Sequence, residues 1–192
     1  MPTGSLPIMR IVMLGAPGSG KGTQAARLSA RLGIPTVSTG EIFRAERDRN
    51  SSLGRRAASY LDHGHLVPDD IAAEVVRRRL SKPDTAPGFL LDGFPRTVPQ
   101  AVTLDELLTA ANTPLDTVLD LRVDRDELTR RLSARGRSDD TPATVARRLA
   151  EYAAKTAPLI DFYRQLGKLT TLDATGTVED VTARAIAALA GN

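Results

Sequence analysis

The chain has 192 residues, of which 41% are hydrophobic and 26% are charged, and this length suits one well-packed α/β domain with a small insert at most. No apolar run approaches the roughly 20 residues that a membrane-spanning helix needs, so a membrane partner is not expected. The sequence holds no cysteine, and its net charge of +3 comes from interspersed acidic and basic residues, which argues against disulfides, a cysteine nucleophile, Cys-ligated zinc and nucleic-acid partners.

Helices and strands alternate through the first half of the chain. In order we expect a strand at 10–14, a helix at 20–32, a short strand at 36–38, a helical stretch at 41–63, a helix at 69–80 and a strand at 88–92. The polar stretch at 41–63 breaks at 50–52 and would bury little, as suits a mobile insert, and Thr39 is expected to cap it. The last of these strands is an apolar run that ends in Asp92, which is typical of a central parallel strand buried on both faces.

The second half continues the alternation. It predicts a helix at 98–111, a strand at 115–123, a helix at 125–134, a helical region from 142 with Pro158 in its later part, a strand at 168–172 and a helix at 178–189. Residues 1–8, ahead of the first strand, are expected to be a disordered extension. The alternation indicates an α/β fold, a five-stranded parallel sheet with helices on both faces and right-handed crossovers.

The loop after the first strand carries the clearest functional motif. Residues 15–21, GAPGSGK, have the spacing G-x-x-x-x-G-K between a strand and a helix. The glycines let backbone N–H groups converge on phosphate oxygens, the helix adds a positive N-terminal end, and Lys21 supplies a point charge. This predicts a nucleoside triphosphate site. Because Gly22 rather than Ser or Thr follows the lysine, direct contact between a metal ion and Thr23 is not expected.

Four segments together resemble the nucleoside monophosphate kinases, and adenylate kinases most of all. They are GAPGSGKGT at 15–23, STGE at 38–41 followed by Arg44, GHLVP at 64–68, and LDGFPR at 91–96 followed by Gln100. The resemblance covers nearly all of residues 9–189. It implies a P-loop NTPase fold and reversible phosphoryl transfer from Mg-ATP to AMP, giving two ADP, in adenine-nucleotide homeostasis.

An AMP site should offer arginines to the phosphate and an amide side chain to the base. Arg44, Arg96 and Gln100 match these needs, and the resemblance implies that Gln100 reads the adenine edge. The other residues that the resemblance assigns to AMP are Thr39, His65, Leu66, Val67, Gly93, Phe94, Pro95, Arg137 and Arg148.

The resemblance also assigns the ATP side and the chemistry. The ATP-binding residues would be Gly18, Ser19, Gly20, Lys21, Gly22, Thr23, Arg131, Arg135 and Gly176. The catalytic cations would be Lys21, Arg96, Arg131, Arg135, Arg137 and Arg148, with Asp92 acting on Mg²⁺ through water. Arg130 and Arg147 are expected to face solvent.

A short lid distinguishes this chain from longer members of that family. Only Gly136 separates Arg135 from Arg137, where longer members carry an additional β-rich lid that sometimes holds zinc, so we expect no zinc here. The expected domains are a core of 9–37, 68–133 and 141–192, a helical AMP-binding insert at 38–67 and a lid at 134–140. Both inserts are expected to close when two nucleotides bind. A cytoplasmic monomer is expected.

Two other functions compete with this one. A UMP/CMP kinase would share the fold, although Thr39 lies where pyrimidine kinases tend to carry alanine. A noncatalytic nucleotide-binding switch would share the phosphate loop, but it would not need a second site built from arginines and a glutamine.

Overall fold

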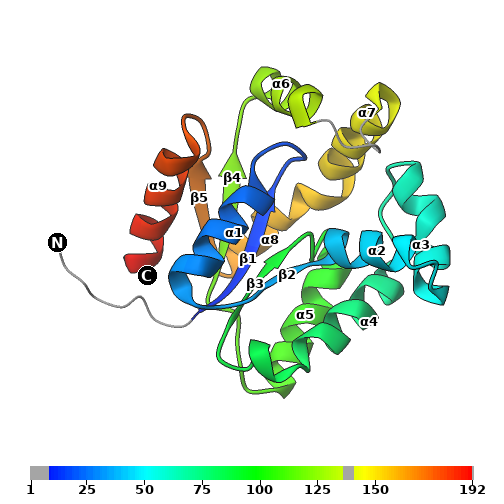
Figure 1. Cartoon of the computed structure of the whole chain (residues 1–192). Coiled ribbons are helices and arrows are strands. Elements are labelled where there is room, and N and C mark those ends of the chain that lie inside the picture. The colour runs from blue at the N-terminus through cyan, green and yellow to red at the C-terminus, as the bar shows by residue number, and fades with distance from the viewer. Residues whose placement is uncertain (1–8, 136–140, 192) are drawn as a thin grey trace.

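A five-stranded parallel sheet forms the centre of the protein, as the computed structural model of residues 9–135 and 141–191 shows (Figure 1). The strand order is β2-β3-β1-β4-β5. The strands are β1 (Arg10–Gly15), β2 (Thr36–Ser38), β3 (Phe89–Asp92), β4 (Thr117–Arg122) and β5 (Leu169–Asp173). The predicted fold class is confirmed, and the strands lie where the apolar runs predict them.

The helices also follow the predicted order. They are α1 (Lys21–Leu32), α2 (Thr39–Asp48), α3 (Ser52–Asp62), α4 (Asp69–Leu80), α5 (Val98–Ala110), α6 (Arg125–Arg135), α7 (Pro142–Glu151), α8 (Pro158–Gln165) and α9 (Val178–Ala190), with a short 3₁₀ turn at Pro83–Thr85. Between α7 and α8 lies a π-helical turn, η2 (Tyr152–Thr156), which the sequence pattern does not predict. None of the helices in the described ranges has the length and apolar character needed to cross a bilayer.

Two local details differ from or refine the predictions. The stretch at 41–63 is two helices, because Asn50 adopts a left-handed φ of 51° and Ser51 starts α3 by accepting a hydrogen bond from the Gly54 N–H. The prediction that Thr39 caps the first of them is wrong. Ser38 is the N-cap of α2 and accepts from the Glu41 N–H, whereas Thr39 is already helical.

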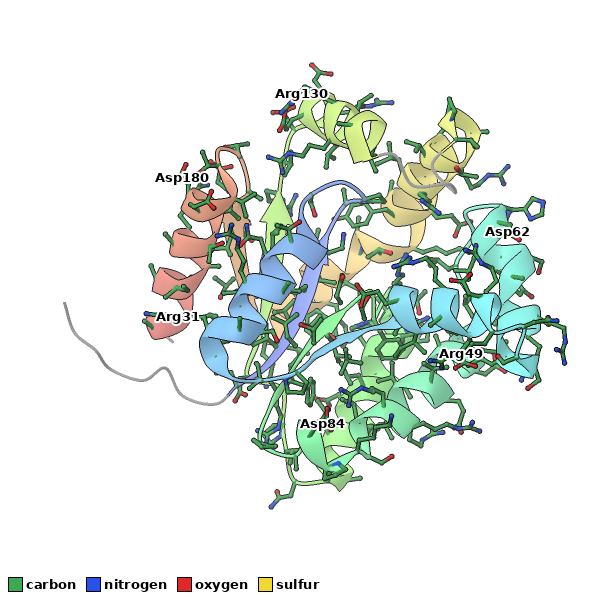
Figure 2. All side chains as sticks on the ribbon, viewed as in Figure 1. Arg31, Arg49, Asp62, Asp84, Arg130 and Asp180 are labelled. Carbon is green, nitrogen blue, oxygen red and sulfur yellow. The ribbon has the colours of Figure 1, made fainter. Side chains whose placement is uncertain are left out.

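Helices cover both faces of the sheet. On one face Val12, Leu91 and Val118 pack in a cluster with residues of α4, α5 and α8. On the other face Ile11, Leu90 and Leu119 pack with residues of α1 and α9. Neighbouring residues of a central strand are therefore both buried, which explains why these strands are continuous apolar runs in the sequence. Charged side chains such as Arg31, Asp84 and Asp180 lie on the outside (Figure 2).

The strand order places the functional segments at one edge. Met13 of β1 and Ser38 of β2 are both in register with Asp92 of β3, so the loops that follow these three strands leave the sheet side by side. The α2–α3 pair extends from the end of β2 beyond the sheet (Figure 1). Ligands of open parallel sheets bind at such a carboxyl edge, where the chain turns in opposite directions from neighbouring strands.

Candidate active site

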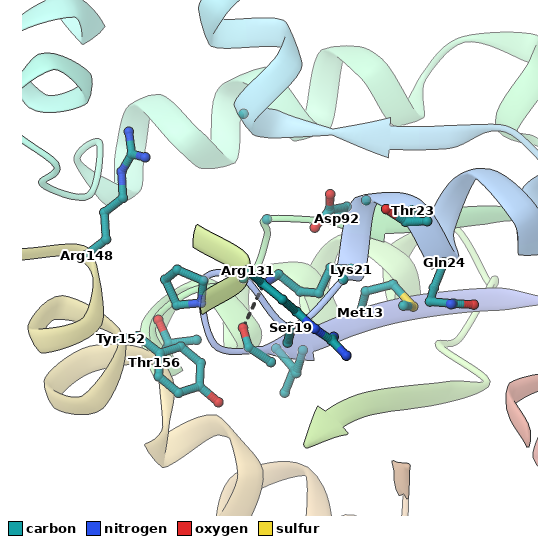
Figure 3. Close-up of a pocket in the computed structure, with 18 of the residues that line it drawn as sticks. Met13, Ser19, Lys21, Thr23, Gln24, Asp92, Arg131, Arg148, Tyr152 and Thr156 are labelled. Carbon is teal, nitrogen blue, oxygen red and sulfur yellow. Dashed lines mark hydrogen bonds between the residues drawn. The ribbon is translucent and has the colours of Figure 1, made fainter. Parts of the chain in front are cut away.

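A cleft of about 730 Å³ opens at this edge of the sheet (Figure 3). Its lining comes from the phosphate loop, the turn after β3, the start of α2, and residues of α6, α7, η2 and the β5–α9 loop. This volume lies within the range of small-molecule sites, ~300–1,000 Å³. Segments that are far apart in the sequence thus contribute to one cavity.

The N-terminus of α1, in the phosphate loop, has no side-chain cap. Gly20, with a left-handed φ of 96°, is the N-cap of α1 and makes no side-chain capping bond. The first N–H groups of the helix therefore point into the loop, as an anion site requires. Ser19 is 1% exposed, and its hydroxyl has no hydrogen-bond partner among the described residues.

Lys21 is held above this loop. Its Nζ donates to the carbonyl oxygens of Gly15 at 2.8 Å and of Ala16 at 3.0 Å. Figure 3 shows Lys21 beside the loop. The ammonium group is thereby placed over the N-terminus of α1, where the helix dipole adds to its positive charge. This is the electrostatic arrangement expected at a polyphosphate site.

Asp92 supplies a carboxylate beside the helix that follows the loop. A Cβ at Gly22 would lie 3.6 Å from Asp92 Oδ2, so the carboxylate faces the first turn of α1. One carboxylate beside a polyphosphate loop fits Mg²⁺, which usually keeps several waters and is held mainly by nucleotide phosphates. Within residues 9–135 and 141–191 there is no group of three His, Asp or Glu side chains that could hold a metal ion.

The turn after β3 joins Thr39 to Arg96. Both side chains donate to the Gly93 carbonyl oxygen, Thr39 Oγ1 at 2.9 Å and Arg96 Nε at 2.8 Å. Gly93 has a φ of 86°, and a Cβ there would lie 2.8 Å from Thr39 Oγ1 and 3.1 Å from Arg96 Nη2. Only glycine fits this position without moving the two side chains, so the turn determines where the guanidinium lies.

Arg96 lies among other charges of the cleft. Burial lowers the pKa of the Arg96 guanidinium; the Asp92 carboxylate raises it again, and the nearby cations Arg148 and Arg44 lower it further. All three arginines line the cleft. Because like charges at short range repel, an anion bound between them would be strongly stabilised.

A smaller pocket opens beside Arg96. It is lined by Thr39, Gly40, Phe43, Leu61, His65, Leu66, Val67, Ala72, Gly93, Arg96 and Gln100. Gln100 is 2% exposed; its Oε1 accepts from the Arg96 N–H at 2.7 Å, and its Nε2 donates to Asp69 Oδ1 at 2.7 Å. The structure therefore brings together Gln100 and most of the residues predicted for the AMP site. Phe94 instead lies in the core, 1% exposed, while Pro95 lines the main cleft.

Comparison with known proteins identifies the family of this site. A family model described as adenylate kinase matches residues 13–168. The chain belongs to the adenylate kinase family. An adenylate kinase of Mycolicibacterium paratuberculosis is 52% identical to it, over 94% of this chain and 99% of that protein. Adenylate kinases of Thermobifida fusca and Salinispora tropica are 51% and 49% identical, each over 94% of this chain and 98% of the relative. The predicted family is confirmed, and the chain is a phosphotransferase.

Two of the segments that were predicted for ATP lie close together, namely α6 and the β5–α9 loop. Arg131 Nε donates to Glu127 Oε1 at 2.6 Å, and Arg131 Nη2 donates to the Ala174 carbonyl oxygen at 3.0 Å. These bonds join α6 to the β5–α9 loop, which lines the cleft through Gly176. Arg135 is the last residue of α6. Arg137 and the predicted lid from 136 to 140, like the extension 1–8, lie outside the described residues.

Two arginines expected in solvent, Arg130 and Arg147, are both exposed, and each also makes a contact. Arg130 is exposed and forms an ion pair with Glu127, although it also reaches the rim of the cleft. Arg147 Nη1 lies 3.5 Å from His65 Nε2, so it adjoins the end of the α2–α3 segment. Its contact joins residues far apart in the chain, and the spacing of α7 gives no sign of it.

Several residues of the cleft have no recognisable signal in the sequence. Thr156 Oγ1 donates to the Arg96 carbonyl oxygen at 2.9 Å, and Glu151 Oε1 lies 3.1 Å from His65 Nδ1. Tyr152 also lines the cleft; burial, followed by the nearby Asp120 carboxylate, raises its pKa to about 12. A tyrosine with this pKa stays neutral at physiological pH and does not act as a base there.

Proposed function

We propose that the protein transfers the terminal phosphoryl group of Mg-bound ATP to AMP, giving two ADP. The observation that carries this proposal is that the cleft around the phosphate loop adjoins a second pocket, with Gln100 at its wall, and that Arg96 lines both. A nucleotide on each side would place its phosphates toward Lys21 and Arg96. The membership in the adenylate kinase family supports the same assignment.

In this mechanism the protein aligns two nucleotides and stabilises charge, since phosphoryl transfer leaves it little covalent work. Lys21 and the N-terminus of α1 would hold the ATP phosphates, and Arg44 would hold the AMP phosphate. Arg96, Arg148 and Arg131 would stabilise the transferring group. Mg²⁺ brought in with ATP would neutralise phosphate charge, with Asp92 orienting its waters.

The domain roles are part of the proposal. Residues 38–67 would act as the AMP-binding insert, and residues 134–140, with Arg135 and Arg137, would close over ATP. The 38–67 segment supports the first assignment because it borders the cleft and the Gln100 pocket through Gly40 of α2, Leu61 of α3 and His65 just after α3. Closure over both nucleotides would exclude water and suppress ATP hydrolysis.

A coupled assay of ATP with AMP, GMP, CMP or UMP tests the function. We expect ADP formation with AMP at a kcat/KM at least ~100-fold above that with any other acceptor, given how strongly sites built to hydrogen-bond a base reject mismatched ones. A preference for CMP or UMP would instead make the protein a pyrimidine kinase. ATP binding without transfer to any acceptor would make it a noncatalytic switch.

The remaining properties are proposals of the same kind. We propose a cytoplasmic monomer that needs Mg²⁺, holds no zinc and binds neither nucleic acid nor membranes. The absence of cysteine and the small net charge support these points. Light scattering of the purified protein, elemental analysis and the loss of activity in excess EDTA would test them. Stoichiometric zinc or a stable dimer would contradict them.

A further inference from the structure

Asp69 is hydrogen-bonded to Gln100 from outside the pocket that Gln100 lines. It is the first residue of α4 and is not among the residues that line the cleft or the Gln100 pocket. Both of its carboxylate oxygens are used: Oδ1 accepts from Gln100 Nε2 at 2.7 Å, and Oδ2 accepts from Thr97 Oγ1 at 2.9 Å. The Thr97 hydroxyl oxygen also accepts from the Gln100 N–H at 3.3 Å and caps α5. Asp69 therefore joins the starts of α4 and α5.

The amide of Gln100 is restrained at both of its ends by partners with fixed roles. The carboxylate of Asp69 can only accept, and the backbone N–H of Arg96 can only donate. If the amide turned over, its oxygen would face the carboxylate and its NH₂ group would face the N–H. Two hydrogen bonds would be replaced by two repulsive pairs, in a residue that is 2% exposed and so has little water to compensate.

This restraint decides which base edge Gln100 can bind. With one N–H and one oxygen lone pair already used, one N–H and one lone pair remain for a ligand. A 6-aminopurine offers the matching pair, an acceptor at ring N1 beside an amino donor. A 6-oxopurine offers the reverse, a ring N–H donor beside an oxygen acceptor, and would need the amide in the opposite orientation.

We propose that Asp69 is a positioning residue that sets the base specificity of the acceptor site by fixing the orientation of the Gln100 amide. The inference rests on the proposed AMP site. It predicts that the acceptor site discriminates between AMP and IMP. These nucleotides have the same sugar and phosphate, but AMP has an amino group at C6 and an unprotonated N1, whereas IMP has an oxygen at C6 and a proton on N1. Pocket size alone would not separate two purines so similar in shape.

The test measures dissociation constants of AMP and IMP, together with the KM for ATP. Asp69→Asn keeps the shape of the side chain but lets it donate as well as accept, so the amide is no longer restrained at that end. We expect the preference for AMP over IMP to fall about tenfold or more, the effect of losing one buried hydrogen bond to a charged group, with the KM for ATP unchanged. Asp69→Ala, which removes the carboxylate altogether, should cause at least as large a loss and serves as the second variant.

Asp70→Asn is the matched control. Asp70 is the next residue of the same helical turn, is exposed, and carries the same charge at the α4 N-terminus. It should leave the AMP/IMP ratio unchanged. In a Gln100→Ala background, Asp69→Asn should add no further loss, because the two residues act through one amide.

The outcomes separate the inference from the function on which it rests. If Gln100→Ala lowers the AMP/IMP ratio but Asp69→Asn weakens both ligands by the same factor, Asp69 has only a structural role and the inference is wrong. An additive loss in the double variant would also overturn it. If Gln100→Ala itself leaves the ratio unchanged, then Gln100 does not read the base, and the proposed AMP site fails together with the inference.

Discussion

At the residue scale, the cleft depends on a few cations, and Lys21 is the one bound to the phosphate loop itself. Replacing it by methionine keeps the length of the side chain and removes the charge that would follow the negative charge of the transferring phosphates. We expect Lys21→Met to lower kcat by about 10²-fold or more while the fold is retained. Steady-state kinetics and circular dichroism would measure both.

The control for this prediction is Lys82→Met, which removes an exposed lysine before the 3₁₀ turn. It should leave kcat unchanged. Near wild-type turnover in folded Lys21→Met protein would show that the phosphate loop does not act on the reacting phosphates.

Asp92 is the second residue whose role can be tested by itself. If it orients waters of a nucleotide-bound Mg²⁺, Asp92→Asn should raise the Mg²⁺ concentration for half-maximal rate about 10-fold or more, the range seen for groups that orient metal ligands. Titration of the rate with Mg²⁺ at fixed ATP measures this. Asp105→Asn, on the exposed side of α5, is the control and should leave the titration unchanged. An equal shift in both variants would point to a general charge effect instead.

Sequence motifs predict the members of this site better than they predict its internal bonds. The phosphate loop, Arg96 and Gln100 stand in motifs whose spacing is a local property, so these residues could be predicted to meet at one site. The bonds from Thr39 to Gly93 and from Asp69 to Gln100 join residues 54 and 31 positions apart, and they depend on how helices pack. No local pattern encodes such contacts, and the roles of the site residues stay predictions.

At the scale of elements, α2 and α3 pack unusually close at Gly54. This buried glycine is in the first turn of α3, and a Cβ there would lie 2.2 Å from the Glu46 carbonyl oxygen of α2. Helix propensity alone would make Gly54→Ala stabilising by about 0.5–1 kcal/mol. The backbone contact reverses the sign, because two helices would have to separate, at a typical overpacking cost of about 1–3 kcal/mol.

We therefore expect Gly54→Ala to lower the Tm and to raise the KM for AMP more than the KM for ATP, since α2 borders the Gln100 pocket. Ser59→Ala, on the exposed side of α3, adds alanine without this contact and should leave both unchanged. Thermal unfolding and initial-rate kinetics give the two readouts. A Gly54→Ala protein as stable as the Ser59→Ala protein would mean that α2 and α3 have room between them for a methyl group.

For helices and strands with a clear apolar periodicity, the bounds were predicted to within a residue or two. The π-helical turn η2 was not predicted. The π turn lies where the α7–α8 region continues in sequence through Thr156 and Pro158 without a break in its helical pattern. Pro158 has no N–H to donate to a carbonyl of the preceding turn, and just before it the Ala157 N–H donates five residues back to the Tyr152 carbonyl oxygen, which is the spacing of a π turn. The proline marks the irregularity, but the type of turn depends on packing around Thr156, which the sequence does not show.

At the scale of the whole molecule, the cations of the cleft come from separate structural elements. Lys21 belongs to the start of α1, Arg96 to the turn after β3, Arg44 to α2, Arg131 to α6 and Arg148 to α7. Arg49 at the end of α2 and Arg130 in α6 lie at two outer parts of the molecule (Figure 2). Cations that are brought together without an anion repel one another, so a ligand-free protein has no electrostatic reason to close.

Two bound nucleotides change this balance, because their phosphates supply negative charge at the point where the cations would converge. Closure then gains free energy only when both are present, as a ligand-driven shift requires. Diadenosine pentaphosphate, which joins both nucleotides in one molecule, should therefore bind far more tightly than ATP or AMP alone. It should also shorten the distance between two spin labels attached to the cysteines of an Arg49→Cys, Asp126→Cys double variant. Pulsed electron–electron double resonance measures this distance. AMP alone is the control and should leave most of that distance unchanged. Since Asp126 lies in the expected core, this distance follows the AMP-binding insert alone. Tight binding with no change in distance would therefore refute closure of that insert while leaving the two nucleotide sites intact.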